Sequence, residues 1–108
     1  MELRHLTYFV TVATTGGFGK AARSLNVSQS AISEQMRDLE DEVGTALIDR
    51  THRQIRLTAQ GEVFLTGARA TLQAAERTVQ AVQQSLRGEI GNLTIGFSLV
   101  VTVASFLP

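Results

Sequence analysis

The sequence predicts a mainly α-helical fold, with one short β-hairpin followed by a single long helix. Three observations support this. Apolar residues recur at helical spacing in three segments before residue 44, residues 54–58 alternate polar and apolar side chains, and residues 59–87 carry a heptad pattern. With 108 residues, of which 44% are hydrophobic, the chain has room for one ordinary core.

Two short helices are predicted before residue 26. The first covers residues 3–15 and ends at Gly16 and Gly17. The second covers residues 18–25 and is followed by Asn26, which tolerates the left-handed backbone of a tight turn. Their apolar stripes are Leu3, Leu6, Phe9, Val10 and Ala13 in the first, and Ala21, Ala22 and Leu25 in the second.

A third helix runs from Ser28 to about Val43. The Ser28 hydroxyl can accept from a free N–H group of the first turn, and Gly44 fits the left-handed position after the last turn. One face is apolar, with Ile32, Met36, Leu39 and Val43 at spacings of four, three and four. The opposite face carries Ser30, Ser33, Glu34, Arg37 and Asp41. Taken alone this polar face is as typical of a solvated helix as of one that reads another molecule.

A two-stranded wing is predicted next. Residues 54–58 alternate as a half-buried strand does, and residues 46–49 can pair with them across a turn at residues 50–53. Ten Lys and Arg balance ten Asp and Glu over the whole chain, so its net charge is zero. Positive charge nevertheless gathers at this hairpin, opposed only by Asp49: Arg50, His52, Arg53 and Arg56.

Thr58 can cap a long helix from about residue 59 to residue 87, which is roughly 43 Å at 1.5 Å per residue. Its apolar residues alternate at spacings of three and four, as in a coiled coil: Leu65, Ala68, Leu72, Ala75, Val79, Val82 and Leu86. The stripe could also pack inside its own chain. Because the three short helices offer too little surface to cover it, we favour a homodimer joined through this helix.

Two helices joined by a tight turn and followed by a basic hairpin form a winged helix-turn-helix, which places one helix in the DNA major groove. Four runs also resemble the LysR-type transcriptional regulators. They are Met-Glu-Leu-Arg-His-Leu at the start, Ala-Ala-Arg-Ser-Leu-Asn-Val-Ser-Gln-Ser-Ala-Ile-Ser at 21–33, Leu39-Glu40, and Leu-Thr-Ala-Gln-Gly at 57–61. The resemblance covers essentially the whole chain.

The resemblance implies three parts. A winged helix-turn-helix DNA-binding domain covers residues 1–58, and a linker helix at 59–87 pairs antiparallel with a second chain. Residues 88–108 would be the hinge and the start of a two-lobed α/β effector-binding domain, with Leu93–Phe97 as its first strand and a helix start after it. We therefore expect a truncated chain without an effector pocket. A small-molecule effector, and any oligomer higher than the dimer, would belong to the full-length protein.

By position in the family, the recognition helix at 28–43 meets base edges and the wing near 50–56 meets the backbone or minor groove, on a dyad site. Ser30 replaces the proline that is commonest there, and Ile48 replaces a phenylalanine, which alters only core packing. Glu34 replaces an arginine, and because a carboxylate repels phosphate but accepts from cytosine N4, we expect a shifted base preference. The expected DNA-binding residues are Ser28, Gln29, Ser30, Ser33, Glu34, Arg37, Arg50 and Arg53.

Other functions fit the sequence poorly. The absence of cysteine excludes disulfides and thiolate metal sites, and the run at residues 16–20 lacks the first glycine and the hydroxyl of a phosphate loop. His5 and His52 lie in different elements with no carboxylate to orient them, so no catalytic triad is expected. We expect no enzyme activity, cofactor or metal. The 15 residues Leu93–Leu107 are too short for a membrane span, and the start Met-Glu-Leu-Arg-His lacks the basic segment and apolar run of a signal peptide. We therefore expect a cytoplasmic protein without a membrane partner.

Two hypotheses about function remain. In the first, the chain is a sequence-specific DNA-binding dimer, the operator-reading part of a transcription regulator. In the second, it is a dimerising helical interaction module with a degenerate DNA-binding face, as the zero net charge and Glu34 suggest. Binding to duplex DNA with a steep salt dependence would distinguish them.

Overall fold

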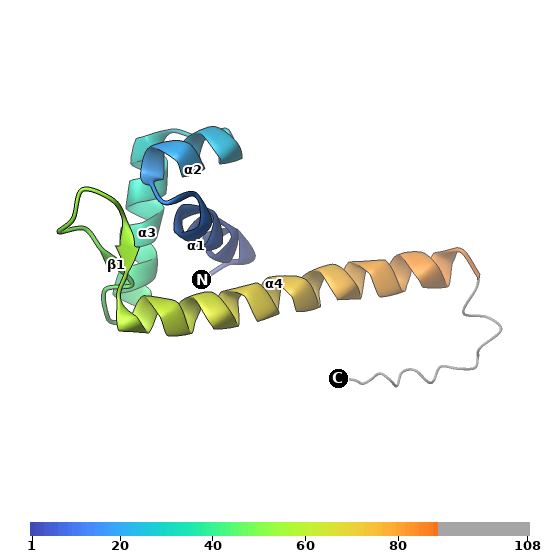
Figure 1. Cartoon of the computed structure of the whole chain (residues 1–108). Coiled ribbons are helices and arrows are strands. Elements are labelled where there is room, and N and C mark those ends of the chain that lie inside the picture. Colours follow the sequence, from blue (N-terminus) through green and yellow to red (C-terminus); the bar gives the residue numbers. More distant parts are fainter. Residues whose placement is uncertain (89–108) are drawn as a thin grey trace. The chain divides into compact units, whose positions relative to one another are not determined.

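A computed structural model describes residues 1–88 of the chain. Its elements follow the sequence in the order α1 (Leu3–Thr15), α2 (Phe18–Leu25), α3 (Gln29–Val43), β1 (Ile48–Asp49), β2 (Arg56–Leu57) and α4 (Ala59–Leu86) (Figure 1). The expected mainly α-helical fold with a two-stranded wing is confirmed. The expected strand at Leu93–Phe97 and the helix start after it lie outside the described residues. The described residues divide into two units, the first Met1–Leu72 and the second beginning at Gln73. No helix within residues 1–88 is long and apolar enough to cross a bilayer.

The turns around α2 and α3 follow from local backbone chemistry. Asn26 has the left-handed backbone expected of it, with φ 60° and ψ 44°, and its N–H donates to the Arg23 carbonyl at 3.3 Å. The Ser28 hydroxyl caps α3 by accepting from the Ala31 N–H at 3.1 Å. Gly44 ends α3 with φ 94°, a conformation that a side chain would oppose. Asn26 and Ser28 thus shape the turn from α2 into α3, and Gly44 ends α3.

The core of the first unit joins α1, α2, α3 and the start of the wing. The Phe9 ring also meets the Phe64 ring of α4 edge-on, with centroids 5.1 Å apart. Leu3 and Val43 are 50% and 42% exposed, unlike the stripes predicted for their helices, because each lies in a terminal turn. The buried core cluster is Phe9, Val12, Ala21, Ala22, Ile32, Met36, Leu39, Leu47 and Ile48.

The wing is an antiparallel pair in which Ile48 lies opposite Leu57 and Asp49 opposite Arg56. Each strand has two residues, fewer than the four and five predicted. The N–H groups of Leu47 and Ile48 both donate to the side chain of Glu40, so the β1 segment is also bonded to α3. The Ile48 side chain is buried, consistent with a role in core packing alone.

The start of α4 is held against the wing. The Thr58 hydroxyl accepts from the Gly61 N–H at 3.0 Å, as its predicted capping role requires, and donates to the Ala46 carbonyl at 2.8 Å. The Thr58 N–H donates to the Leu47 carbonyl at 3.0 Å. Gly61 packs so closely on this segment that a Cβ there would overlap the Leu47 carbonyl oxygen. Only glycine fits at this crossing.

Candidate nucleic-acid interface

The polar face of α3 is open to solvent in its first two turns. The side chains of Gln29, Ser30 and Glu34 are exposed and Ser33 is half-buried. Within residues 1–88, neither Glu34 nor the exposed Arg37 takes part in an ion pair. A shallow hollow along this face is lined by Ser30, Ser33, Glu34, Arg37, Asp38 and Asp41. The predicted recognition residues of α3 thus share one surface, on which Gln29, Ser30 and Glu34 are exposed to solvent.

The two halves of α3 differ in charge. The first half carries serines and Gln29 with the single carboxylate of Glu34, whereas Asp38, Asp41 and Glu42 crowd the second half. Glu42 is offset by the terminal ammonium group of Met1, 3.0 Å from its Oε2. The N-terminal end also carries the positive end of the helix dipole. A polyanion would therefore approach this helix by its first two turns.

Ser28 has a structural task that limits its other contacts. Its Oγ accepts from the Ala31 N–H and lies 3.3 Å from the Oγ of Ser30. Ser28 therefore holds the start of α3 and the Ser30 side chain together. Of the two hydroxyl groups, that of Ser30 is not used for capping.

The exposed cations of the wing are Arg53 and Arg56. Arg53 makes no ion pair within the described part of the chain. The Nε2 of His52 lies 3.6 Å from the Asp49 Oδ2. Hydrogen bonds from the Thr51 hydroxyl at 2.6 Å and the Thr51 N–H at 2.9 Å lower the pKa of Asp49. The carboxylate is thereby turned to its own loop, and Arg53 stays free of it.

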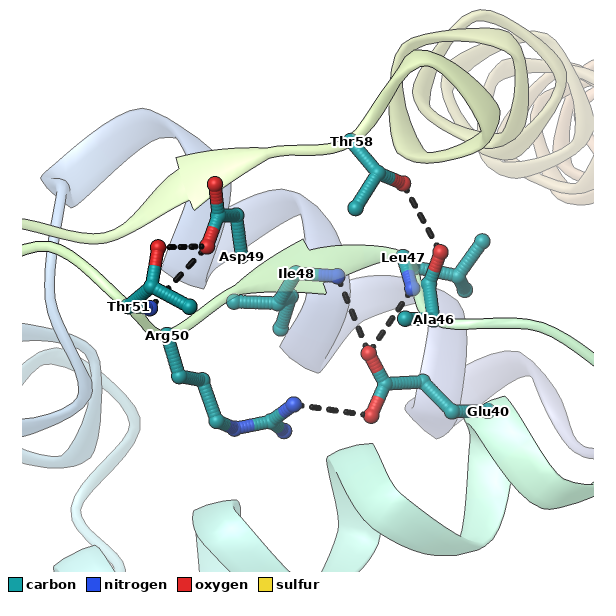
Figure 2. A network of polar contacts seen from close by, with 8 residues as sticks. All are labelled: Glu40, Ala46, Leu47, Ile48, Asp49, Arg50, Thr51 and Thr58. Carbon is teal, nitrogen blue, oxygen red and sulfur yellow. Dashed lines mark hydrogen bonds and ion pairs between the residues drawn. The ribbon is translucent and has the colours of Figure 1, made fainter.

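Arg50 does not belong to this exposed charge. Its Nη1 donates to the Glu40 Oε1 at 2.9 Å (Figure 2). Its guanidinium carbon also lies 5.5 Å from the centroid of the Phe18 ring. The side chain is 30% exposed and already neutralised by Glu40. The sequence predicts that Arg50 offers a free charge to DNA. In the structure its orientation is set by the ion pair with Glu40, which its position in a run of basic residues does not reveal.

The heptad stripe of α4 is only partly uncovered. Leu65 packs against the core cluster and Ala68 is 3% exposed, so the chain itself covers these two positions, unlike the full seven-residue seam expected. Leu72 and Ala75 are half-buried. The last three positions are open, with Val79 55%, Val82 56% and Leu86 82% exposed. An apolar strip on an exposed helix is typical of a contact surface.

Histidine and carboxylate side chains are the metal ligands that this sequence offers. Within residues 1–88, no three His, Asp or Glu side chains are placed to hold a metal ion. His5 uses its Nδ1 to accept from the Glu2 N–H at 2.9 Å, which closes the start of α1. The sequence reasoning missed the Glu40 network, although a glutamate beside the buried Leu39 was a signal that it needed partners.

Comparison with known proteins supports a regulator. The family model described as a bacterial regulatory helix-turn-helix protein of the lysR family matches residues 3–62. The HTH-type transcriptional regulator AlsR of Bacillus subtilis (strain 168) is 48% identical over 108 residues, which are 100% of this chain and 35% of AlsR. TfdT of Cupriavidus pinatubonensis (strain JMP 134 / LMG 1197) is 42% identical, over 99% of this chain and 48% of TfdT. The chain thus spans less than half the length of either relative.

Solved structures agree with these relatives. The crystal structure of a CbnR_DBD-DNA complex matches with a TM-score of 0.76 and 43% identity, over 80% of this chain and 99% of that one. The BenM_DBD/benA site 1 DNA complex matches with a TM-score of 0.79 and 36% identity, over 82% of this chain and 100% of that one. Fold, family model and relatives lead to one conclusion: this chain belongs to the LysR family of bacterial regulatory helix-turn-helix proteins.

Proposed function

We propose that this chain is the DNA-binding and dimerising part of a transcription regulator, and that it acts by binding DNA in the cytoplasm and not by catalysis. The observation that carries the proposal is the first half of α3, which exposes Gln29, Ser30 and Glu34 in the same compact unit as a wing with exposed arginines. The N-terminal residues of a recognition helix are the ones that reach base edges in helix-turn-helix proteins. CbnR_DBD and BenM_DBD, which share this fold, were solved bound to DNA.

The proposed roles follow from chemistry and exposure. Base edges in the major groove are read by Gln29, Ser30, Ser33 and Glu34, of which Glu34 accepts from cytosine N4. Phosphates are contacted by the exposed arginines, Arg37 on α3 and Arg53 on the wing. We assign Ser28 the capping of α3 and leave Arg50 out of the DNA contacts, because its guanidinium is bound to Glu40.

The partner proposed for the open strip of α4 is a second copy of the chain. Val79, Val82 and Leu86 keep the heptad spacing and are exposed, and Leu72 and Ala75 continue the same stripe. Two wings and two recognition helices would then engage half-sites of a dyad about 34 to 36 Å apart, or a multiple of that spacing.

A salt titration tests the DNA proposal against the alternative of a helical interaction module, which the zero net charge and acidic second half of α3 favour. DNA selected from a random pool by the chain supplies the specific site. We expect log affinity to fall linearly with log salt. Binding that does not depend on salt, or no binding at all, would support the interaction module.

Two variants then separate the proposed roles. Arg53→Ala should weaken binding to all sequences and reduce the salt slope by about 1. Ser33→Ala should cost about 1 to 3 kcal/mol at one base position and leave the slope unchanged. Arg77→Ala removes the same charge from α4 and serves as the control for net charge. Base-specific losses from Arg53→Ala, or uniform losses from Ser33→Ala, would reverse the assigned roles.

A further inference from the structure

One carboxylate joins the recognition helix to the wing. Glu40 projects from α3 toward β1, where its Oε2 accepts from the Leu47 N–H at 2.8 Å and the Ile48 N–H at 2.9 Å (Figure 2). Its Oε1 accepts from the Arg50 Nη1 at 2.9 Å. The Glu40 side chain is 11% exposed. Three donors that lie before, within and after β1 therefore converge on a single side chain of α3.

Arg50 also connects this network to α2. Its guanidinium lies over the ring of Phe18, the first residue of that helix. The Nε and Nη2 atoms of Arg50 are shielded from solvent and have no hydrogen-bond partner in the described part of the chain. The Glu40 carboxylate is thus the hydrogen-bond acceptor that balances this charge there, and losing it would leave a shielded guanidinium without a counter-charge.

Two arginines of the wing differ in their surroundings. Arg50 is turned inward by Glu40, while Arg53 lies in the loop beyond β1 and is exposed. The place of Arg53 relative to α3 then depends on how firmly β1 is tied to that helix. The two strands have only two residues each, so their ladder alone gives little rigidity.

We propose that Glu40 and Arg50 are positioning residues for DNA recognition, which lock the wing to the recognition helix so that both contact DNA in one register. The inference rests on the proposed function. A specific complex needs α3 in the groove and the wing on the backbone together, and rigid linkage removes the cost of ordering the second contact. Non-specific binding does not require this register, so the lock acts on the ratio of specific to non-specific affinity.

Glu40→Gln tests the lock while retaining the length of the side chain and one oxygen acceptor. We expect affinity for the selected dyad site to fall about 10-fold or more, while affinity for an unrelated duplex of equal length changes less than about 3-fold. Amide hydrogen exchange should quicken at Leu47 and Ile48. Glu42→Gln, the same change two residues along α3 at a side chain that does not touch the wing, should leave both readouts as in the wild type.

Arg50 provides a second, independent pair of variants. Arg50→Met removes the charge but keeps the stem, and should lower the affinity ratio in the same direction as Glu40→Gln. Arg50→Lys restores a cation within reach of Glu40 and should recover most of the ratio. If Glu40→Gln fails to fold, the comparison of Arg50→Met with Arg50→Lys tests the inference by itself.

Three outcomes would overturn the inference. They are an unchanged affinity ratio in the folded variants, equal losses on specific and non-specific DNA, and an Arg50→Lys chain no better than Arg50→Met. If the wild-type chain does not bind duplex DNA, the proposed function fails and the inference fails with it. If the wild-type chain binds duplex DNA and the variants keep its ratio of specific to non-specific affinity, only the proposed lock is refuted.

Discussion

Among the glycines of residues 1–88, Gly61 has the least room for a side chain, because α4 lies against the wing there. A Cβ at Gly61 would overlap the Leu47 carbonyl oxygen and lie 3.0 Å from the Leu47 carbonyl carbon and 3.2 Å from the Leu57 Cβ. The Leu47 carbonyl cannot move away freely, since it accepts the Thr58 N–H at 3.0 Å. Gly61→Ala must therefore separate the start of α4 from the wing.

The size of the effect follows from opposing terms. Overpacking of a closed site costs about 1 to 3 kcal/mol, and weakening the Thr58 hydrogen bond adds about 1 kcal/mol. Replacing glycine with alanine inside a helix returns about 0.5 to 1 kcal/mol. The free energy of unfolding should thus fall by about 2 kcal/mol, and at about 4 to 8 °C per kcal/mol the Tm should drop by roughly 8 to 16 °C.

Gly67 provides the control within the same helix. It is exposed, and a Cβ there would meet no atom within 4 Å. Gly67→Ala should therefore raise the Tm by a few degrees through helix propensity alone. Thermal unfolding followed by circular dichroism measures both variants, at matched protein concentrations because a dimer melts in a concentration-dependent way. If Gly61→Ala melts at or above the wild-type temperature, the start of α4 is not packed against the Leu47 backbone.

Two further predictions concern the dimer and the wing loop. Val79→Asp places a carboxylate on the open strip of α4 and should give a folded monomer in analytical ultracentrifugation. Gln80→Asp, which lies off the strip, should stay dimeric. If Val79→Asp is still a dimer, the strip is not part of the interface. Asp49 should titrate below its ordinary pKa in carboxyl-detected NMR, and Thr51→Val should raise that pKa by removing the largest cause of the shift. Because the folded-state pKa is lowered, the stabilisation by these hydrogen bonds is present above the ordinary pKa and is lost as the pH falls through the lowered value. An Asp49 pKa unchanged in Thr51→Val would contradict the hydrogen bonding described.

Short-range signals in the sequence were sufficient to predict the helices. The ranges predicted for α1 and α2 match the structure, and α3 begins directly after the capping Ser28. Asn26 and Gly44 adopt the left-handed backbone expected of them. Each of these features depends on residues within one or two turns of one another, where backbone sterics and capping hydrogen bonds dominate. The polar face of α3 was predictable for the same reason, since its members share a helical period.

Contacts between distant segments could not be predicted in this way. Arg50 reads as one more cation of a basic wing, yet its orientation is set by Glu40, ten residues earlier in another element. The heptad stripe reads as uniform, yet the chain covers Ala68 and leaves Val79 open. Gly61 reads as a helix-weakening residue until the Leu47 backbone lies against it. Periodicity determines which face of an element is apolar or polar, whereas packing in three dimensions determines which neighbour that face meets, and that choice settles which charges and which apolar side chains remain free for a partner.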